Sequence, residues 1–203
     1  MKVEEIIENP KPAKTNKPIH KLLVHRWSPR LFSDRKVARK DLETILEAAR
    51  WAASSMNAQP WRFVYAYEGS EAYKKISGCL SEFNRKWVHH APVLMVTAFK
   101  EQFDSGKENF HALHDLGLAV GNMSLQATSM GIALHSMAGL DWKKAQDIFD
   151  VPEGYHVATG IAIGYYDDDI SELPEDLEEM EKKERKRKPR SAIASEDTWS
   201  FSE

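Results

Sequence analysis

Residues 110–130 read FHALHDLGLAVGNMSLQATSM, and this stretch carries the clearest helical period in the sequence. Apolar residues recur there at three- and four-residue steps, which places them along one side of an α-helix. We expect that side to face the core and to comprise Leu113, Leu116, Val120, Met123, Ala127 and Met130. The opposite side is mixed, with the polar residues Asp115, Asn122, Gln126 and Ser129 next to Leu118 and Leu125. Two leucines on a polar side predict a surface that a partner covers.

Strand and helix patterns alternate on both sides of this helix. Aromatic and β-branched runs predict strands at residues 61–67, 92–99, 132–139 and 156–166. Helical spacing of apolar residues predicts helices from Asp41 to about Ser54 and over residues 71–80 and 141–149. Residues 92–99 are apolar at nearly every position, so this strand should lie inside the sheet with both faces covered. The expected fold class is α/β (α+β), a mixed central sheet flanked by helices, and spacing leaves the strand order open.

Composition divides the 203 residues into a single domain and two flanking segments. Residues 1–20 hold three prolines among lysines and lack a period, which predicts a mobile leader without chemistry. Residues 21–170 form the predicted domain. From residue 171 the sequence is first acidic and then strongly basic, so we expect residues 171–203 to add nothing to the core. Trp199 and Phe201 near the end of this segment predict an arm that docks onto another surface.

Charge and cysteine content limit the partners and the location. The sequence has 28 Lys and Arg against 31 Asp and Glu, so no global field would attract a polyanion. We therefore expect neither a nucleic acid nor a membrane as partner, and residues 92–99 are far shorter than the roughly 20 apolar residues of a membrane-spanning helix. The single cysteine, Cys79, cannot form an intramolecular disulfide, and no secretory signal stands at the N-terminus. The expected location is the cytoplasm.

Arginines stand near both ends of the sequence in groups that suit an anion. Residues 26–32 read RWSPRLF, and residues 185–190 read RKRKPR. Arg26 and Arg30 keep their charge and offer forked donors for a phosphate or for the anionic edge of a ring. The alternatives are a pair of surface arginines for the first group and a solvated charge run for the second.

Hydroxyl and amide side chains gather between a predicted helix and a predicted strand. Residues 53–63 read ASSMNAQPWRF, and their polar members include Ser54, Ser55, Asn57 and Gln59. Amide groups supply donors and acceptors together, as a flat heterocycle with a uracil-like edge requires, and Trp61 adds an aromatic neighbour. Helix termination accounts for one or two of these residues, whereas four of them followed by Pro60 favour a binding site.

Several other site patterns are missing from the sequence. It contains no G-x-S-x-G, no G-x-G-x-x-G after a strand and no P-loop, which argues against a hydrolase or a kinase. His111 and His114 are three residues apart on a predicted helix, but no third ligand of metal type is evident, so we expect no metal site.

The order of these segments resembles the nitroreductase family. The resemblance rests on RWSPRLF at 26–32, ASSMNAQPWRF at 53–63, and Asn84 shortly before APVL. It continues with DLGLAVGNMSLQATSMG in the central helix, MAGLD after it and ATGIAIGY in the last strand. The match covers roughly residues 22–166, together with RKP near the end. Each piece is weak alone, but their agreement in order is specific.

The resemblance implies FMN bound at the two-fold interface of a homodimer, with the C-terminal arm exchanged between subunits. The implied cofactor-binding residues are Arg26, Trp27, Ser28, Arg30, Ser54, Ser55, Asn57, Gln59, Asn84, Ala138, Gly139, Arg185 and Arg187. Residues 26–30 would come from one subunit and residues 54–57 from the other. Arg26, Arg185 and Arg187 would hold the phosphate, while Arg30 would lie by the pyrimidine edge and stabilise the reduced flavin. Asn84 would reach the ring, and the backbone of residues 138–139 would face its reactive nitrogen.

The resemblance also implies an oxidoreductase in which NADH or NADPH gives hydride to FMN, which passes it to a small acceptor such as a nitroaromatic or a quinone. The flavin would do the chemistry, so no catalytic side chain beyond Arg30 is expected. Many relatives carry glutamate where Ala138 stands and lysine where Trp87 stands, which leaves the substrate preference open. The alternatives are a dehalogenase or a flavin-cleaving enzyme of the same fold, or a non-catalytic flavin-binding protein.

Overall fold

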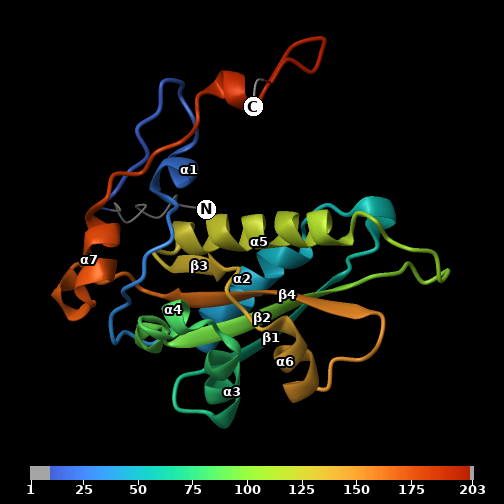
Figure 1. Cartoon of the computed structure of the whole chain (residues 1–203), viewed down its shortest axis with the longest axis horizontal. Helices are drawn as coiled ribbons and strands as arrows, with labels where there is room; N and C mark the ends of the chain where they lie inside the picture. The colour runs from blue at the N-terminus through green and yellow to red at the C-terminus, as the bar shows by residue number, and fades with distance from the viewer. Residues whose placement is uncertain (1–9, 202–203) are drawn as a thin grey trace.

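An antiparallel sheet of four strands, in the order β1-β2-β4-β3, forms the centre of residues 10–201, the part of the chain that the computed structural model describes (Figure 1). The strands are β1 (Trp61–Tyr67), β2 (Val93–Lys100), β3 (Ala133–Met137) and β4 (Tyr155–Gly164). The helices are α1 (Lys21–His25), α2 (Arg39–Arg50), α3 (Glu71–Cys79), α4 (Glu82–Arg85), α5 (Ala112–Ser129), α6 (Trp142–Ile148) and α7 (Glu175–Lys182). Short 3₁₀ turns lie at η1 (Ser55–Asn57), η2 (Val88–His90), η3 (Ile170–Glu172) and η4 (Arg190–Ala192). The predicted α/β class is confirmed.

Strand β2 divides the core into two layers. Successive side chains of a strand point to opposite faces of the sheet. Val93 and Met95 accordingly join the cluster under α2 and α5, whereas Leu94, Val96 and Ala98 join the cluster under α3 and α6. Residues 93–98 are all buried, so the predicted central strand with two covered faces is confirmed.

All strand pairings of the described sheet are antiparallel, so the expectation of a mixed sheet is wrong in this detail. The register places Trp61 opposite Phe99, and a bulge interrupts the β2–β4 pairing between Thr97 and Ala98. The buried hydroxyl of Thr97 is satisfied there by the hydroxyl of Thr159 at 2.8 Å. Strand direction depends on which end of the sheet each connection reaches, and element spacing does not reveal this.

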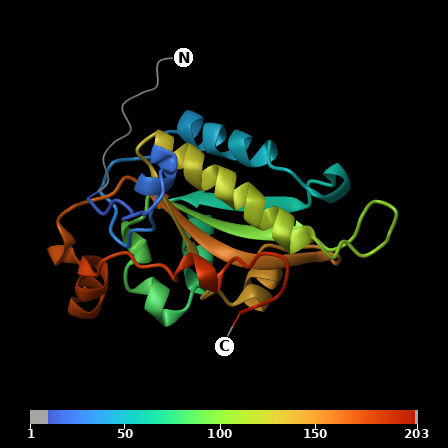
Figure 2. The ribbon, with the colours of Figure 1, turned by 90° about the horizontal axis from the view of Figure 1, so that it is seen from above.

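Helix α5 packs beside α2 on one face of the sheet, as Figure 2 shows from above. Its buried residues are Ala112, Asp115, Leu116, Ala119, Met123, Ser124 and Ala127. The prediction is therefore wrong for two residues of this helix: Leu113, expected in the core, is 59% exposed, and Asp115, expected on the outer side, is only 2% exposed. The small side chains at 112, 119 and 127 lie against the core, because they allow α2 to approach α5 closely. The hydrogen bond that Asn122 Nδ2 donates to the Ala48 carbonyl, at 3.2 Å, joins the two helices.

The opposite face of the sheet carries α3, α6 and part of the C-terminal segment. Leu173 and Leu177 are buried with Ile76 and Ala145 in the same cluster. The expectation that residues 171–203 add nothing to the core is therefore wrong. Helix α7 has Leu177 on its inner side, and most of its charged residues face solvent. The average composition of the segment does not indicate this amphipathic arrangement.

The predicted elements agree with the observed ones except at their ends. Strand β1 has the predicted bounds, and the predicted helices over 71–80 and 141–149 correspond to α3 and α6. Helix α2 ends at Arg50 rather than near Ser54, because Trp51 already leaves helical geometry and the chain then turns sharply through η1. No helix among residues 10–201 is long and apolar enough to cross a bilayer.

The two ends of the described chain run side by side (Figure 1). Arg185 Nη1 donates to the carbonyls of Lys11 and Val24, both at 2.9 Å, and the amide of Ala13 donates to Val24 as well. Residues 10–20 of the predicted leader thus contact the C-terminal segment, while residues 1–9 lie outside the described part. Beyond α7, residues 190–201 extend away from the body on the side of α5 that faces away from the sheet.

Candidate functional site

The segment RWSPRLF lies along β3 and the end of β4, fixed by its apolar members. Trp27, Leu31 and Phe32 are buried, and the Ser33 amide donates to the Tyr165 carbonyl at 2.8 Å. Since these residues are held in the core, the alternating positions of Arg26, Ser28 and Arg30 stay partly exposed. The apolar half of the segment therefore positions the polar half.

Arg26 meets Arg185 and Arg187 of the C-terminal segment along one cavity of about 770 Å³. Arg26 Nη1 donates to Ser28 Oγ at 3.3 Å, and Arg185 Nη2 donates to the Arg26 carbonyl at 2.8 Å. Burial and then the charge of Arg187 lower the pKa of Arg26, and burial with both neighbours lowers the pKa of Arg185. Among the described residues none of the three has a carboxylate partner, so a phosphate would relieve their repulsion.

Arg30 lies against α7 and α4. Its Nη1 donates to Glu181 Oε2 at 3.2 Å, and its guanidinium lies 6.0 Å from the ring centre of Phe83. The buried Nε has no hydrogen-bond partner among residues 10–201. Arg30 thus keeps donors for a ligand while its side chain is held in place. Neither Phe83 nor Glu181 follows from the sequence patterns, although the Ser81 cap before Phe83 hints at an ordered turn.

Asn84 and Gly139 meet in the same region. Asn84 is buried, and its Nδ2 donates to the Gly139 carbonyl at 3.1 Å. A Cβ on Gly139 would lie 2.6 Å from Ser81 Oγ and 2.8 Å from Asn84 Nδ2, so glycine is needed for this close approach. Ala138, by contrast, is exposed. These residues are the predicted neighbours of the ring, and they lie on the same side of the molecule as Arg30.

Trp87 and the half-buried His135 pack against each other below the arginine segment. Trp87 is fully buried, and its ring centre lies 4.6 Å from that of His135. His135 Nδ1 lies 2.7 Å from the Pro29 carbonyl. Burial lowers the pKa of His135 to about 4, with smaller effects of Arg30 and Arg26 in the same direction, so the imidazole is neutral near pH 7. The sequence singles out Trp87 only as a departure from relatives and His135 not at all.

The turn ASSMNAQ adopts a backbone that few non-glycine residues take up. Met56, Asn57 and Gln59 have φ of 53°, 54° and 48°. Such left-handed residues persist only when their surroundings hold them. The Gln59 amide donates to Ser54 Oγ at 3.0 Å, and the Ser55 amide donates to the buried Asp115 carboxylate at 3.0 Å. The sequence does not indicate this role of Asp115, because a single acidic residue on an amphipathic helix is normally solvated.

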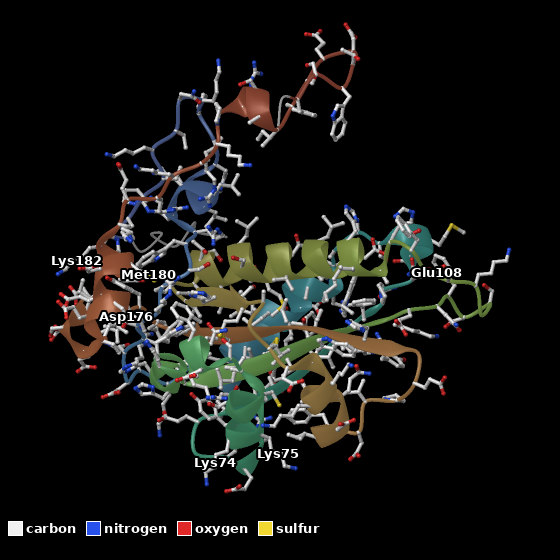
Figure 3. The ribbon with its side chains drawn as sticks, viewed as in Figure 1. Lys74, Lys75, Glu108, Asp176, Met180 and Lys182 are labelled. Atoms are coloured by element: carbon white, nitrogen blue, oxygen red, sulfur yellow. The ribbon has the colours of Figure 1, made fainter. Side chains whose placement is uncertain are left out.

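The structure does not bring the two predicted groups together within one chain. The turn at η1 lies beside the start of α5, while Arg30, which pairs with Glu181 of α7, lies with α4 and α7 toward its other end (Figure 1). Figure 3 shows the same separation, with Glu108 near one end and Asp176, Met180 and Lys182 of α7 at the other. The 18 residues of α5 span about 27 Å. One chain therefore places the two predicted groups toward opposite ends of α5.

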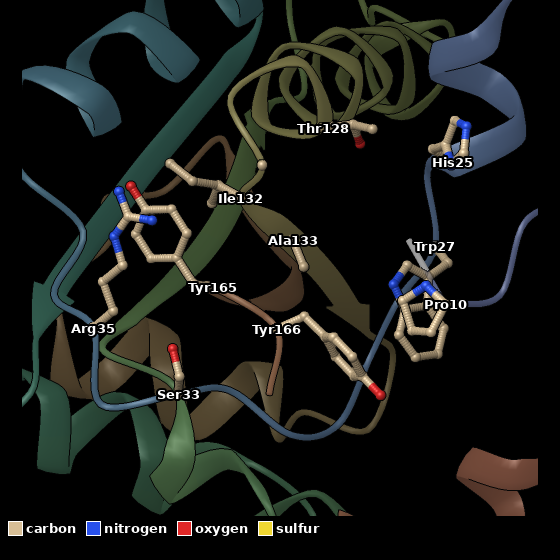
Figure 4. A pocket seen from close by; sticks show the side chains of 11 residues that line it. Pro10, His25, Trp27, Ser33, Arg35, Thr128, Ile132, Ala133, Tyr165 and Tyr166 are labelled. Atoms are coloured by element: carbon tan, nitrogen blue, oxygen red, sulfur yellow. The ribbon is translucent and has the colours of Figure 1, made fainter. Parts of the chain in front are cut away.

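Trp27 does not join the arginine cluster. Its ring lies beside Tyr166 at one side of a separate pocket of about 280 Å³, and Tyr165 and Arg35 line the other side (Figure 4). Its ring centre is 5.0 Å from that of Tyr166, and the Arg35 guanidinium lies 3.7 Å from the ring centre of Tyr165. The structure thus gives Trp27 a packing role below the segment.

The outer side of α5 continues into the arginine segment. A groove of about 480 Å³ is bounded by Leu118, Leu125 and Gly121 of α5 and by Arg26 and Ser28. Leu118 is 40% exposed, which agrees with the predicted partner surface. The described residues contain no group of three or more His, Cys, Asp and Glu arranged to hold a metal ion.

Comparison with known proteins assigns the family. The model of the nitroreductase family matches residues 23–84 and 75–165. The chain belongs to the nitroreductase family. The predicted family and fold are thereby confirmed.

Solved and curated relatives agree with this membership. A crystal structure described as that of an oxidoreductase containing FMN superposes with a TM-score of 0.88 at 35% identity, covering 93% of this nitroreductase-family chain and 96% of its own. The FMN reductase [NAD(P)H] of Bacillus subtilis (strain 168) is 25% identical, covering 91% of this chain and 75% of its own. Iodotyrosine deiodinase of Thermotoga neapolitana is 25% identical, covering 78% of this chain and 94% of its own.

Proposed function

We propose that this member of the nitroreductase family is an FMN-dependent oxidoreductase that transfers hydride from NADH or NADPH to a small acceptor, at sites shared by two copies of the chain. The single observation that carries the proposal is the pair of half-sites at opposite ends of α5. One half holds the arginines, Asn84 and Gly139, and the other holds the strained turn at residues 54–59. Its FMN and NAD(P)H dependence agrees with the names of its relatives.

A two-fold axis near the middle of α5 would complete both sites at once. In such a pair the two α5 helices run antiparallel, so the start of one lies at the end of the other. Gly117 and Gly121 are exposed on the outer side with open space around them, which allows two helices to approach closely. Leu118 and Leu125 would be buried between them. The turn of one subunit would then face the arginine segment of the other.

The C-terminal arm supports the same assembly. Ile193 is 71% exposed and Trp199 is 85% exposed. In the described part of the chain, the hydrogen bonds of residues 190–201 stay within residues 189–201. An arm with apolar side chains and no bonds to its own body suits a second subunit, so we propose that it is exchanged in the dimer.

The residues present fit FMN. Among residues 10–201, Arg26, Arg185 and Arg187 have no acidic partner, and they offer planar donors for the phosphate. Arg30 gives one guanidinium donor to Glu181, which leaves others for the pyrimidine edge, and the Gly139 backbone lies against Asn84, the residue expected at the ring. When bound, FMN supplies the hydride chemistry. The chain's own residues bind the cofactor, orient it and place the Arg30 charge where negative charge develops on reduction.

The acceptor follows from what surrounds Arg30. Phe83 is 41% exposed beside the guanidinium, so a planar aromatic molecule would find a stacking partner and a cation together. We therefore propose nitroaromatics and quinones as acceptors. The cytoplasm remains the proposed location.

The purified protein tests this proposal directly. It should be yellow, release FMN on denaturation, lose its colour with NADH or NADPH without oxygen, and regain it with a nitroaromatic or a quinone. Arg30→Ala should weaken FMN binding about 10-fold or more, since a charged hydrogen bond is lost. Arg50→Ala, which removes an exposed arginine of α2, is the matched control. A colourless protein that takes up no added FMN contradicts the proposal, and a yellow protein that no nicotinamide reduces indicates a binding protein.

The similarity to iodotyrosine deiodinase of Thermotoga neapolitana favours one second candidate, reductive removal of halide from a halogenated phenol. The assay is halide release from iodotyrosine by the reduced protein. Release faster than nitroaromatic reduction would establish this candidate in place of the first.

A further inference from the structure

One carboxylate lies directly against the segment that carries Arg30. Glu181 is only 3% exposed. Its Oε1 accepts from the Arg30 backbone amide at 3.3 Å, and its Oε2 accepts from Arg30 Nη1 at 3.2 Å. The carboxylate thus holds both the backbone and the side chain of the same residue.

The position of Glu181 follows from the way α7 packs. Leu177 lies one turn earlier on the same side of the helix and is fully buried in the core. This anchor directs Glu181 inward, whereas Glu179 on the same helix is exposed. A buried carboxylate is strongly disfavoured unless it is paired and hydrogen-bonded, and here Arg30 provides both.

The pairing leaves Arg30 able to bind a ligand. A guanidinium has five N–H donors, and Glu181 takes one of them. The Nε remains without a partner among the described residues. Glu181 therefore offsets the charge of Arg30 and restricts its side-chain conformation, while other N–H donors of Arg30 stay available.

We infer that Glu181 is a positioning residue that fixes Arg30 and offsets its charge. As a result, the site favours reduced over oxidised FMN less strongly than it would with an unpaired arginine. This inference rests on the proposed FMN site. A lone cation beside the pyrimidine edge favours the more negative, reduced flavin. A carboxylate a few ångströms behind the cation opposes that effect, because charges still interact strongly at such distances in a poorly solvated site. The protein is thereby tuned to give electrons up to an acceptor.

The test is the affinity of the full-length protein for oxidised and reduced FMN in Glu181→Gln. Glutamine keeps an acceptor for the Arg30 amide but removes the charge. We expect the ratio of the two dissociation constants to move about tenfold in favour of reduced FMN, equivalent to a midpoint potential about 30 mV more positive for a two-electron couple. Glu179→Gln removes the same charge from an exposed position of α7 and should leave the ratio unchanged.

Two further variants separate charge from folding. Glu181→Asp keeps the charge and should stay within about twofold of the wild-type ratio, since a shorter carboxylate still offsets Arg30. Glu181→Met is neutral and tolerates burial, so it should reproduce the shift if Glu181→Gln does not accumulate in a folded state.

The inference is overturned if the neutral variants leave the ratio at the wild-type value, move it in favour of oxidised FMN, or shift it no more than Glu181→Asp does. A wild-type protein that binds no FMN overturns the proposed function as well, whereas a wild-type protein that binds and cycles FMN with an unmoved ratio in Glu181→Gln overturns only this inference.

Discussion

At the scale of single residues, the candidate site depends on buried and half-buried polar groups that bind the backbone of its segments. His135, Asn84 and Asp115 are each tied to backbone groups of the segments that carry the predicted cofactor residues. Burying such groups is favourable only when their hydrogen bonds are made, so each one fixes a loop in one conformation.

His135 makes stability depend on pH. Its pKa is lowered to about 4 in the fold, below the ordinary value of 6.5, chiefly by burial. Its contribution is therefore complete above pH 6.5 and is lost as the pH falls through 4, because the unfolded chain binds the proton first. The free energy of unfolding should decrease by about 3 kcal/mol from this group across that window.

Urea unfolding between pH 7.5 and 4.5 measures this effect. His135→Asn removes the titrating group and should flatten the decrease, whereas His111→Asn at an exposed position should retain it. Parallel curves for the wild type and His135→Asn would show that the group does not titrate as described.

Gly139 should tolerate no side chain. In Gly139→Ala the new Cβ would press on Ser81 Oγ and Asn84 Nδ2, so we expect a loss of about 1–3 kcal/mol in stability and weaker FMN binding. Gly78→Ala is the control, because nothing lies within 4 Å of a Cβ there and alanine favours the α3 helix. Thermal unfolding compares the two, and equal stability of Gly139→Ala and the wild type would argue against the close contact.

The sequence predicts some of these residues and not others for a physical reason. Arg26, Arg30 and Asn57 lie in short segments whose combination of residues is unusual, so a local sequence pattern can indicate them. The structural roles of Glu181 and His135 depend on partners more than a hundred residues away in the chain. Such contacts are set by the packing of α7 and β3, which local patterns do not contain.

At the scale of elements, α5 both supports the sheet and carries the outer surface proposed for the dimer. Its period predicts a helix correctly, but it places Leu113 inside and Asp115 outside, opposite to what is found. Small residues at the α2 contact decide the true orientation, because they let α5 rotate toward its neighbour. The sequence predicts the central strand more accurately, because a strand buried on both faces is apolar at nearly every position.

The outer side of α5 should not accept a charge at Leu118. In Leu118→Glu two carboxylates would enter the proposed interface without partners, so dimer affinity should fall about 100-fold and FMN should be lost with it. Val64→Glu is the control, since Val64 on β1 is 39% exposed, like Leu118 at 40%, and lies away from α5. Light scattering after gel filtration gives the mass, and a Leu118→Glu protein that remains a yellow dimer would place the interface elsewhere.

At the scale of the whole molecule, one chain holds the two proposed half-sites and an arm whose described hydrogen bonds stay within residues 189–201. The turn at η1 lies by the start of α5 and Arg30 lies toward its end, and the helix itself is about 27 Å long. The sequence indicates that both groups exist, whereas only the fold shows that they lie toward opposite ends of α5. The N-terminal residues 10–20 and the arginines of the C-terminal segment do meet, which joins the two ends of the chain at one half-site.

The most direct measurement of a shared site is the FMN content of a mixed dimer. Arg30→Ala disables one half-site, and Asn57→Asp disables the other while keeping a residue that tolerates positive φ. Each variant alone should bind little FMN. Co-expressed with two different tags and purified through both, the mixed dimer contains one site with two intact halves and should hold half the wild-type FMN. A mixed dimer as empty as its parents, or a wild-type monomer with a full complement of FMN, would contradict the shared site.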